Sequence, residues 1–261
     1  MPPAIVVPPD WLAAHLDEAA VRIVDLRDAD AFEQAHIPGA VRLDLGRLGV
    51  PDEGRDNVLL APAGFADLMQ QLGISDGDAV VGYDDQWGLA AARLVWALHY
   101  YGHPQATVLD GGWDRWSEEG RAEASGTTAT AAGHFETSAQ VDLGAESEWI
   151  EARLAEGPLK LLDTRTPAEF EAGHLPSAVS WDWFNAVPPG SWDVTRDPAE
   201  LRQEWTELGI EPDDEVVVYC RSGMRAAHTW VAMRRAGYHR VRLYDGSWQE
   251  WSMRQKGTNA T

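Results

Sequence analysis

The 261-residue sequence has almost no cysteine, an excess of negative charge and no long apolar run. Its one cysteine, Cys220, excludes an intrachain disulfide and is compatible with a reducing compartment. No run of about 18 apolar residues is present for a membrane span. The N-terminus shows no basic stretch followed by an apolar core, so we expect no signal peptide and a cytoplasmic protein. A net charge of -21 disfavours nucleic acid and anionic membrane surfaces as partners.

Metal-ligating patterns are also lacking. The eight histidines show no His-x-x-x-His spacing beside a carboxylate, and His228 has no second thiol near it in the sequence. We therefore expect neither a metal nor a cofactor.

The chain contains an internal repeat. Residues 11–41 align with residues 149–179 without a gap, and Val80–Tyr83 later aligns with Val216–Tyr219. Each copy alternates short apolar strands with amphipathic helices. This alternation predicts an α/β fold with a mostly parallel sheet flanked by helices on both faces.

The repeat and the composition predict two domains. We expect a first domain at residues 1–122, a linker at 123–143 that is rich in Ala, Thr, Gly and Ser, and a second domain at 144–261. Motifs found in both copies are expected to be structural. They are the partly buried ion pairs Asp25–Arg27 and Asp163–Arg165, the turn-supporting histidines His36 and His174, and the Asp-Gly-x-Trp motif that begins at Asp110 and again at Asp245.

The segment Val216–Arg225 carries the strongest chemical signal. Cys220 directly follows an apolar strand, and a helix is predicted at Ala226–Gly237. The backbone N–H groups of such a loop form a nest for negative charge, and the helix N-terminus adds its positive end. Together with Arg221 and Arg225 these groups favour thiolate over thiol. The alternative is a small buried cysteine without chemistry.

The two copies differ at this point of the repeat. Cys220 aligns with Asp84, and the loop of the first copy also holds Asp85 and Trp87. One loop therefore has a nucleophile and two cations, whereas the other has two carboxylates and a tryptophan. We expect one active and one catalytically silent site. Whether Asp84, Asp85 and Trp87 line the active site stays open.

These motifs together resemble the tandem-domain rhodaneses of the thiosulfate/3-mercaptopyruvate sulfurtransferase family. The resemblance covers essentially the whole chain and rests on Asp-x-Arg with His-[Ile/Leu]-Pro-x-Ala in both halves, on Tyr-Cys-Arg-Ser-Gly-Met-Arg, and on Asp-Gly-x-Trp. It implies a silent first domain and a catalytic second domain. It also implies that Cys220 takes a sulfur atom from a small-molecule donor, becomes a persulfide, and passes the sulfur to a thiophilic acceptor such as cyanide.

The loop residues receive roles in substrate binding. We assign Arg221 and Arg225 to the donor and the leaving group, because arginine offers a planar set of donors to oxyanions. Ser222 is expected to donate a hydrogen bond, Gly223 to supply a backbone conformation without a side chain, and Met224 to fill space at the rim.

The donor is less sharply indicated. In the family, a basic residue early in the loop is typical of thiosulfate users, whereas Cys-Gly-Ser-Gly is typical of 3-mercaptopyruvate users. Arg221 resembles the first pattern and Ser222-Gly223 the second. Glu169 stands where 3-mercaptopyruvate users carry an arginine, and the residues that partner their loop serine have no match around Gly46–Asn57. We favour thiosulfate, with 3-mercaptopyruvate as the alternative.

Two other classes of function are considered. A Cys-dependent phosphatase has the spacing Cys-x5-Arg, whereas this loop has the shorter Cys-x4-Arg. A non-enzymatic sulfur carrier or interaction module would not need Cys220 together with both arginines. We expect a monomer or a weak dimer.

Overall fold

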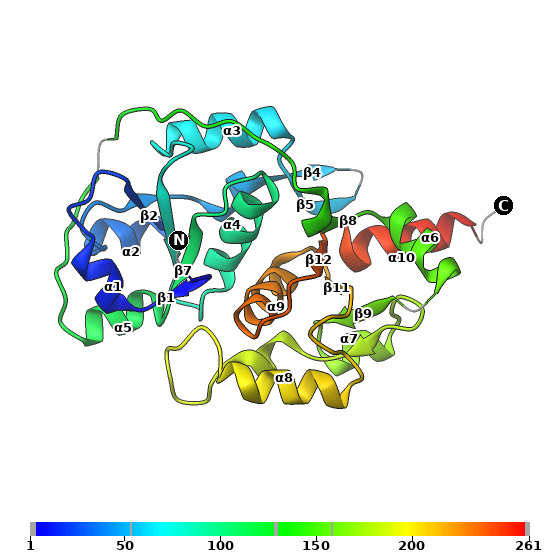
Figure 1. The fold of residues 1–261 in the computed structure, drawn as a ribbon. Coiled ribbons are helices and arrows are strands. Elements are labelled where there is room, and N and C mark those ends of the chain that lie inside the picture. The colour runs from blue at the N-terminus through cyan, green and yellow to red at the C-terminus, as the bar shows by residue number, and fades with distance from the viewer. Residues whose placement is uncertain (1–3, 53, 128–129, 158, 259–261) are drawn as a thin grey trace. The chain divides into compact units, whose positions relative to one another are not determined.

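A computed structural model describes residues 4–52, 54–127, 130–157 and 159–258 (Figure 1). The chain forms two compact units. The first consists of Met1–Gly49, Leu59–Ala139 and Val187–Thr195, and the second of Val50–Val58, Gln140–Ala186 and Arg196–Thr261. Each half of the repeat thus contributes one short segment to the other unit. The boundaries 1–122, 123–143 and 144–261 stay a prediction. Two of the expectations fall partly outside the described residues. They concern the N-terminus without a signal peptide, at residues 1–3, and the linker, at residues 128 and 129.

The first unit is built on a five-stranded sheet in the order β1-β7-β6-β2-β3, in which all neighbours are parallel. Its strands are β1 (Val6–Val7), β2 (Val21–Asp25), β3 (Val41–Arg42), β6 (Ala79–Tyr83) and β7 (Ala106–Leu109). Its helices are α1 (Pro9–Ala14), α2 (Ala29–Gln34), α3 (Pro62–Gln71), α4 (Leu89–Tyr100) and α5 (Gly112–Glu118), with a 3-10 turn η1 at Leu45–Leu48.

Helices cover both faces of this sheet. Tyr83 of β6 packs with Leu12 of α1, Phe32 of α2 and Trp116 of α5 in one buried cluster. Successive residues of a strand face opposite sides of the sheet. The adjacent residue, Gly82, therefore faces the other side, where an added Cβ would contact α4.

The second unit repeats the plan with the strand order β10-β9-β11-β12-β8, again parallel throughout. Its strands are β8 (Gly144–Ala145), β9 (Lys160–Asp163), β10 (Val179–Ser180), β11 (Val216–Tyr219) and β12 (Val241–Tyr244). Its helices are α6 (Ser147–Glu156), α7 (Pro167–Glu171), α8 (Pro198–Glu207), α9 (Met224–Arg235) and α10 (Ser247–Thr258), with 3-10 turns η2 at Val141–Leu143 and η3 at Trp183–Ala186.

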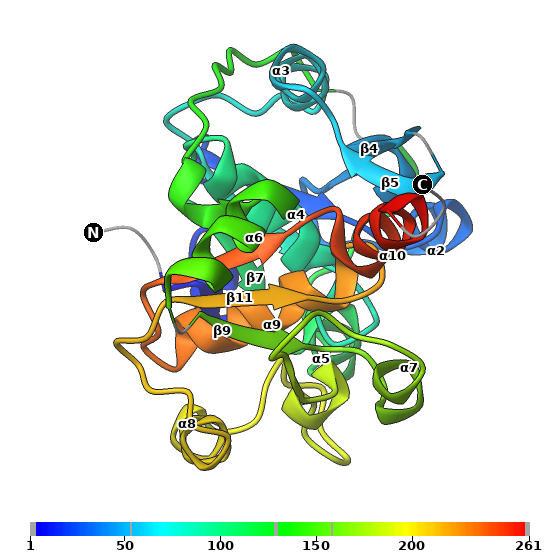
Figure 2. The ribbon, with the colours of Figure 1, turned by 90° about the vertical axis from the view of Figure 1, so that its right-hand side faces the viewer.

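Strand β11 lies in the middle of this sheet beside β9 (Figure 2). All four of its residues are buried, as its run of valines predicts. Tyr219 packs with Ile150 of α6 and Trp251 of α10, while α9 packs on β11 from the opposite face. The expected α/β fold, with parallel sheets flanked by helices, is therefore confirmed.

A short antiparallel hairpin completes the second unit. It consists of β4 (Gly49–Asp52) and β5 (Arg55–Leu59), and its residues Val50–Val58 belong to the second unit although they come from the first half of the sequence. Arg55 binds Glu250 of α10, with 2.7 Å between Nη1 and Oε2.

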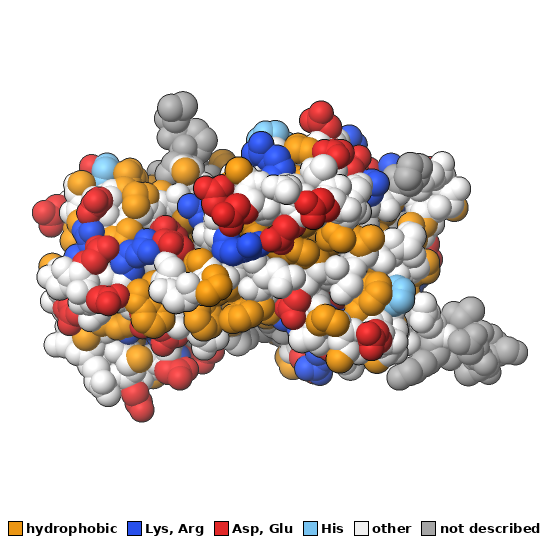
Figure 3. Space-filling view, turned by 90° about the horizontal axis from the view of Figure 1, so that it is seen from below, with side chains coloured by type: hydrophobic (Ala, Val, Ile, Leu, Met, Phe, Trp, Pro, Cys, Tyr) orange, Lys and Arg blue, Asp and Glu red, His pale blue; other side chains and the backbone are white. Residues whose placement is uncertain are grey.

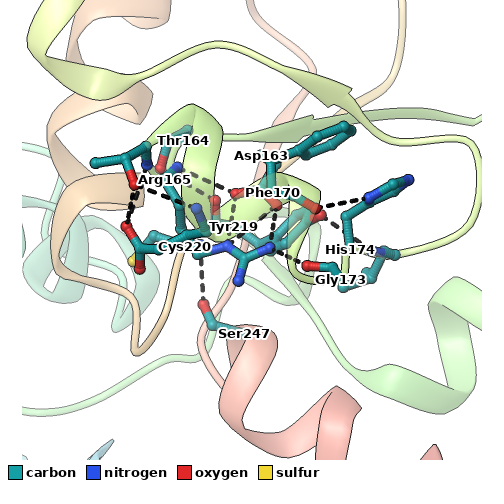
Figure 4. Close-up of polar contacts among 12 residues, drawn as sticks. Asp163, Thr164, Arg165, Phe170, Gly173, His174, Tyr219, Cys220 and Ser247 are labelled. Carbon is teal, nitrogen blue, oxygen red and sulfur yellow. Dashed lines mark hydrogen bonds and ion pairs between the residues drawn. The ribbon is translucent and has the colours of Figure 1, made fainter.

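The repeated ion pairs are present in both units. Arg27 Nη2 lies 2.6 Å from Asp25 Oδ2, and Arg165 Nη2 lies 2.6 Å from Asp163 Oδ2. No more than 2% of any of these side chains is exposed, so the pairs are fully buried rather than partly buried as expected. Figure 4 shows the second pair beside Tyr219.

The turn histidines act as the sequence suggested. His36 Nδ1 donates to the carbonyl oxygen of Phe32 at 2.8 Å, and His174 Nδ1 donates to that of Phe170 at 3.0 Å. Each imidazole also stacks on the same phenylalanine. Both histidines therefore fasten the turn after a short helix.

The surface drawn in Figure 3 carries many Asp and Glu side chains, interspersed with Lys and Arg. Within the described chain, no helix has the length and apolar character needed to cross a membrane.

Candidate active site

Cys220 lies at the carboxyl end of the central strand β11, where α9 begins. Gly223 precedes the helix with φ +85°, a left-handed conformation that glycine adopts without steric cost. The helix begins at Met224, two residues before the predicted start at Ala226. Arg225 therefore belongs to the first turn of the helix, and the loop proper is only Cys220–Gly223.

The loop leaves a set of backbone donors unused. Among the described residues, no acceptor is found for the backbone N–H groups of Arg221, Ser222, Gly223, Met224 and Arg225. The first N–H groups of a helix have no partner inside the helix, and they bind anions readily. This part of the loop can therefore hold a negative charge.

The backbone of Cys220 itself is tied to α10. Its N–H group donates to Ser247 Oγ at 3.3 Å, as Figure 4 shows, and its carbonyl oxygen accepts from the N–H of Trp248 at 3.0 Å. The residue is only 1% exposed, so almost all of it is shielded from solvent. The start of α10 thus fixes the cysteine from the side opposite to α9.

Ser247 is a functional neighbour that the sequence analysis missed. It has φ 52°, an uncommon value for a residue other than glycine, and its side chain is fully buried. Gly112, its counterpart in the first unit, has the same φ, and a Cβ there would lie 2.2 Å from the carbonyl oxygen of Asp84. The repeat could have pointed to Ser247, because the first copy has a glycine where the second has this serine.

Arg225 is held by Glu169 of α7. The two guanidinium nitrogens Nη1 and Nη2 lie 2.7 and 2.8 Å from the two carboxylate oxygens. This hydrogen bonding, together with the charge of the Cys220 sulfur, raises the pKa of Arg225 above its usual value. Hydrogen bonds from Arg225 lower the pKa of Glu169 to about 2. Both groups are therefore charged at neutral pH.

Glu169 is fixed by its own helix as well. Its backbone N–H donates to Thr166 Oγ1 at 3.3 Å, and its Oε2 accepts from the N–H of Thr166 at 3.1 Å. This capping box holds the carboxylate that faces Arg225. In the sequence, Glu169 stands out only as the replacement of an arginine, and its pair with Arg225 was not predicted.

Arg221 also has a carboxylate partner. Its Nη2 lies 2.9 Å from Asp56 Oδ2 of the hairpin, and both side chains are more than half exposed. The site is therefore less positive than the sequence suggested, since each arginine is paired with an acid. Ser222 and Met224 are partly exposed beside these arginines.

The corresponding loop of the first unit shows what such a cradle accepts. Asp84 Oδ1 accepts from the N–H groups of Gln86 and Gly88, both at 2.8 Å, and Oδ2 accepts from those of Ala90 and Ala91 at 2.8 and 2.9 Å. Complete burial raises the pKa of Asp84, and the four amide donors oppose that shift. A carboxylate thus fills the nest at the position of Cys220 in the repeat.

The two loops differ in length by one residue. Gly88 precedes α4 with φ 78°, as Gly223 precedes α9, but three residues separate it from Asp84, whereas two separate Gly223 from Cys220. When the loops are aligned from Cys220 and Asp84, their glycines are therefore displaced by one position.

No group of three or more His, Cys, Asp and Glu side chains in the described chain is placed to hold a metal ion. The chemistry available at the site is that of a thiol, two arginines and backbone N–H groups.

Comparison with known proteins agrees with this arrangement. The rhodanese-like domain model matches residues 8–119 and again residues 146–254. The chain belongs to the rhodanese family. Both matched segments follow the internal repeat, so the expected tandem arrangement of rhodanese domains is confirmed.

Relatives of this rhodanese cover nearly its whole length. A thiosulfate sulfurtransferase of Corynebacterium glutamicum is 33% identical over 95% of this chain and 88% of its own. The sulfur carrier protein TtuD of Thermus thermophilus is 32% identical over 95% of this chain and 94% of its own. The crystal structure of SseA from Escherichia coli, described as a 3-mercaptopyruvate sulfotransferase, superposes with a TM-score of 0.85 at 27% identity, over 94% of this chain and 99% of that one. The expectation of a sulfurtransferase is confirmed at the level of the class.

Proposed function

We propose that this rhodanese transfers the outer sulfur of thiosulfate to a thiophilic acceptor such as cyanide, through a persulfide on Cys220. The observation that carries the proposal is the position of Cys220. Cys220 lies at the base of a loop in which the N–H groups from Arg221 to Arg225 have no acceptor among the described residues, and the charge of its sulfur contributes to the raised pKa of Arg225. Such a setting stabilises an anionic sulfur atom.

In the first step the Cys220 thiolate attacks the outer sulfur of thiosulfate. A sulfur–sulfur bond forms to Cys220 while the sulfur–sulfur bond of the donor breaks, and sulfite leaves with the bonding electron pair. No general base is needed for this attack when the nucleophile is a thiolate. Arg221, which is exposed at the loop, is the group best placed to receive the oxyanion of the donor.

In the second step the acceptor attacks the outer sulfur of the persulfide. The new bond forms to the acceptor, the sulfur–sulfur bond to Cys220 breaks, and the thiolate returns. A persulfide is anionic near neutral pH and extends one atom further than the thiolate. The free N–H groups of the loop are suited to this longer anion, because Asp84 fills the corresponding nest with a carboxylate in the silent unit.

Glu169 supports thiosulfate over 3-mercaptopyruvate. A donor with a carboxylate needs a free cation near the cysteine, and Glu169 already occupies both outer nitrogens of Arg225. The alternative donor is favoured by Ser222-Gly223 in the loop and by the structural match with SseA. A carrier role without turnover is the third possibility, because a relative of similar identity is named as a sulfur carrier.

Steady-state turnover with the two donors distinguishes these possibilities. We expect thiocyanate formation from thiosulfate and cyanide with a higher kcat/KM than pyruvate formation from 3-mercaptopyruvate under the same conditions. The Cys220→Ser variant should be inactive with both. A higher kcat/KM with 3-mercaptopyruvate would overturn the choice of donor, and a single turnover with either donor would favour the carrier.

A further inference from the structure

Asp56 lies on the hairpin β4–β5 and faces the arginine that is exposed at the cysteine loop. Its Oδ2 accepts from Arg221 Nη2 at 2.9 Å and from Gln249 Nε2 at 2.6 Å. Its backbone N–H donates to Gln249 Oε1 at 3.3 Å. A carboxylate is therefore placed directly beside the loop in which Cys220 lies.

The two acid–arginine pairs of the site differ in strength. Glu169 binds Arg225 through two hydrogen bonds, and its carboxylate is also held by the capping box of α7. Asp56 binds Arg221 through one, with 58% and 59% of the two side chains exposed. An exposed single pair contributes little to stability and is screened by salt. The Asp56–Arg221 pair is thus the one that an incoming anion can open.

Opening this pair does not release Asp56. Gln249 still holds its backbone and side chain, and Arg55 on the same hairpin binds both Asp52 and Glu250. Asp56 therefore stays beside the site while Arg221 changes partner. Its negative charge then repels the anion that Arg221 has received.

We propose that Asp56 is a specificity-determining residue, an internal counter-ion that a donor anion must displace from Arg221. It weakens the binding of anionic donors in proportion to their charge. The proposal rests on the function proposed above, because it assigns Arg221 to the donor. It concerns the KM of the donor and leaves the reaction at sulfur unchanged.

The test compares Asp56→Asn with Asp52→Asn. Both substitutions remove one negative charge from the same hairpin, but Asp52 binds Arg55 and not Arg221. We expect Asp56→Asn to lower the KM for thiosulfate about twofold to fivefold with little change in kcat, the range of an exposed ion pair. The KM for singly charged 3-mercaptopyruvate should fall less, and both effects should shrink at high salt. Asp52→Asn should leave both KM values unchanged.

A second readout does not depend on sulfur transfer. Iodoacetate is an anion and iodoacetamide is neutral, so the ratio of their rates of reaction with Cys220 reports the charge beside the sulfur. Asp56→Asn should raise this ratio, and the same substitution should have a smaller effect in an Arg221→Ala background. If wild-type chain transfers no sulfur, the proposed function fails, and this ratio still decides the role of Asp56.

Three results would overturn the proposal. The first is an unchanged ratio in Asp56→Asn, and the second is an equal rise in Asp52→Asn. The third is a higher KM for thiosulfate in Asp56→Asn, which would make Asp56 a support that holds Arg221 in its binding position.

Discussion

Glu169 places its two carboxylate oxygens on the guanidinium of Arg225, with Oε2 2.7 Å from Nη1 and Oε1 2.8 Å from Nη2. The charge of the Cys220 sulfur adds to this carboxylate in raising the pKa of the same guanidinium. Arg225 is therefore not a free cation that waits for a substrate. It is an oriented group whose charge is shared between an acid and the nucleophile.

Glu169 should influence transfer in two separable ways. Glu169→Gln removes the charge but keeps an acceptor for Arg225, so more of the positive charge acts on the donor, and we expect KM for thiosulfate to fall by about threefold. Glu169→Ala also removes the support for the guanidinium, and we expect kcat to fall by about tenfold. Steady-state kinetics of both variants measure the difference. Equal effects of the two substitutions would show that positioning plays no part.

Acid should weaken the fold through the same pair. Arg225 lowers the pKa of Glu169 from its usual 4.5 to about 2 in the folded chain. A lowered pKa means that the ion pair stabilises the fold fully above about pH 4.5, and that this contribution is lost as the pH falls from 4.5 toward 2. The Tm of wild type should thus exceed that of Glu169→Gln near neutral pH, and the gap should narrow across that acid range. A gap of constant size would contradict the assigned ion pair.

The two arginines should give different phenotypes. Arg225→Ala removes the cation that faces the sulfur, so alkylation of Cys220 by iodoacetamide at neutral pH should slow by about tenfold or more. Arg221→Ala should mainly raise KM for thiosulfate, because Arg221 is paired at the exposed rim. The pH profile of alkylation provides the check. An identical midpoint in wild type and Arg225→Ala would remove the electrostatic role of Arg225.

Asp84 should be a stabilising residue of the first unit. Asp84→Ala leaves four backbone N–H groups without their acceptor, and we expect a loss of about 2–4 kcal/mol in the free energy of unfolding of this unit. The neighbouring Asp85 is exposed, so Asp85→Ala serves as a matched control, with an expected change within about 0.5 kcal/mol. Chemical denaturation monitored by tryptophan fluorescence measures both. Equal stability of the two variants would refute the role of the carboxylate in the nest.

The repeat made the fold and the cysteine loop predictable. A run of valines such as Val216–Val218 is typical of a buried strand in a parallel sheet. Cys220 stood out in the sequence because the other copy of the repeat has Asp84 at the same position. The pairs Asp25–Arg27 and Asp163–Arg165 were predictable because their partners are two residues apart and belong to the same strand end.

The charge partners of the site were not predictable. Glu169 and Arg225 are 56 residues apart, and Asp56 and Arg221 are 165 residues apart, so no local pattern connects them. The hairpin of Asp56 comes from the first half of the sequence but belongs to the second unit, which the repeat does not encode. The helix was predicted to begin at Ala226, but it begins at Met224, directly after Gly223. Arg225 therefore lies in the first turn of the helix and not in the loop.

The central claim is that the Cys220 sulfur accepts a sulfur atom and holds it as a persulfide. Intact-mass measurement of the whole chain after mixing with thiosulfate tests this most directly. We predict a gain of one sulfur atom, its removal by cyanide, and no gain in Cys220→Ser. An unchanged mass of the wild-type chain with both thiosulfate and 3-mercaptopyruvate, or an equal gain in Cys220→Ser, would contradict the claim.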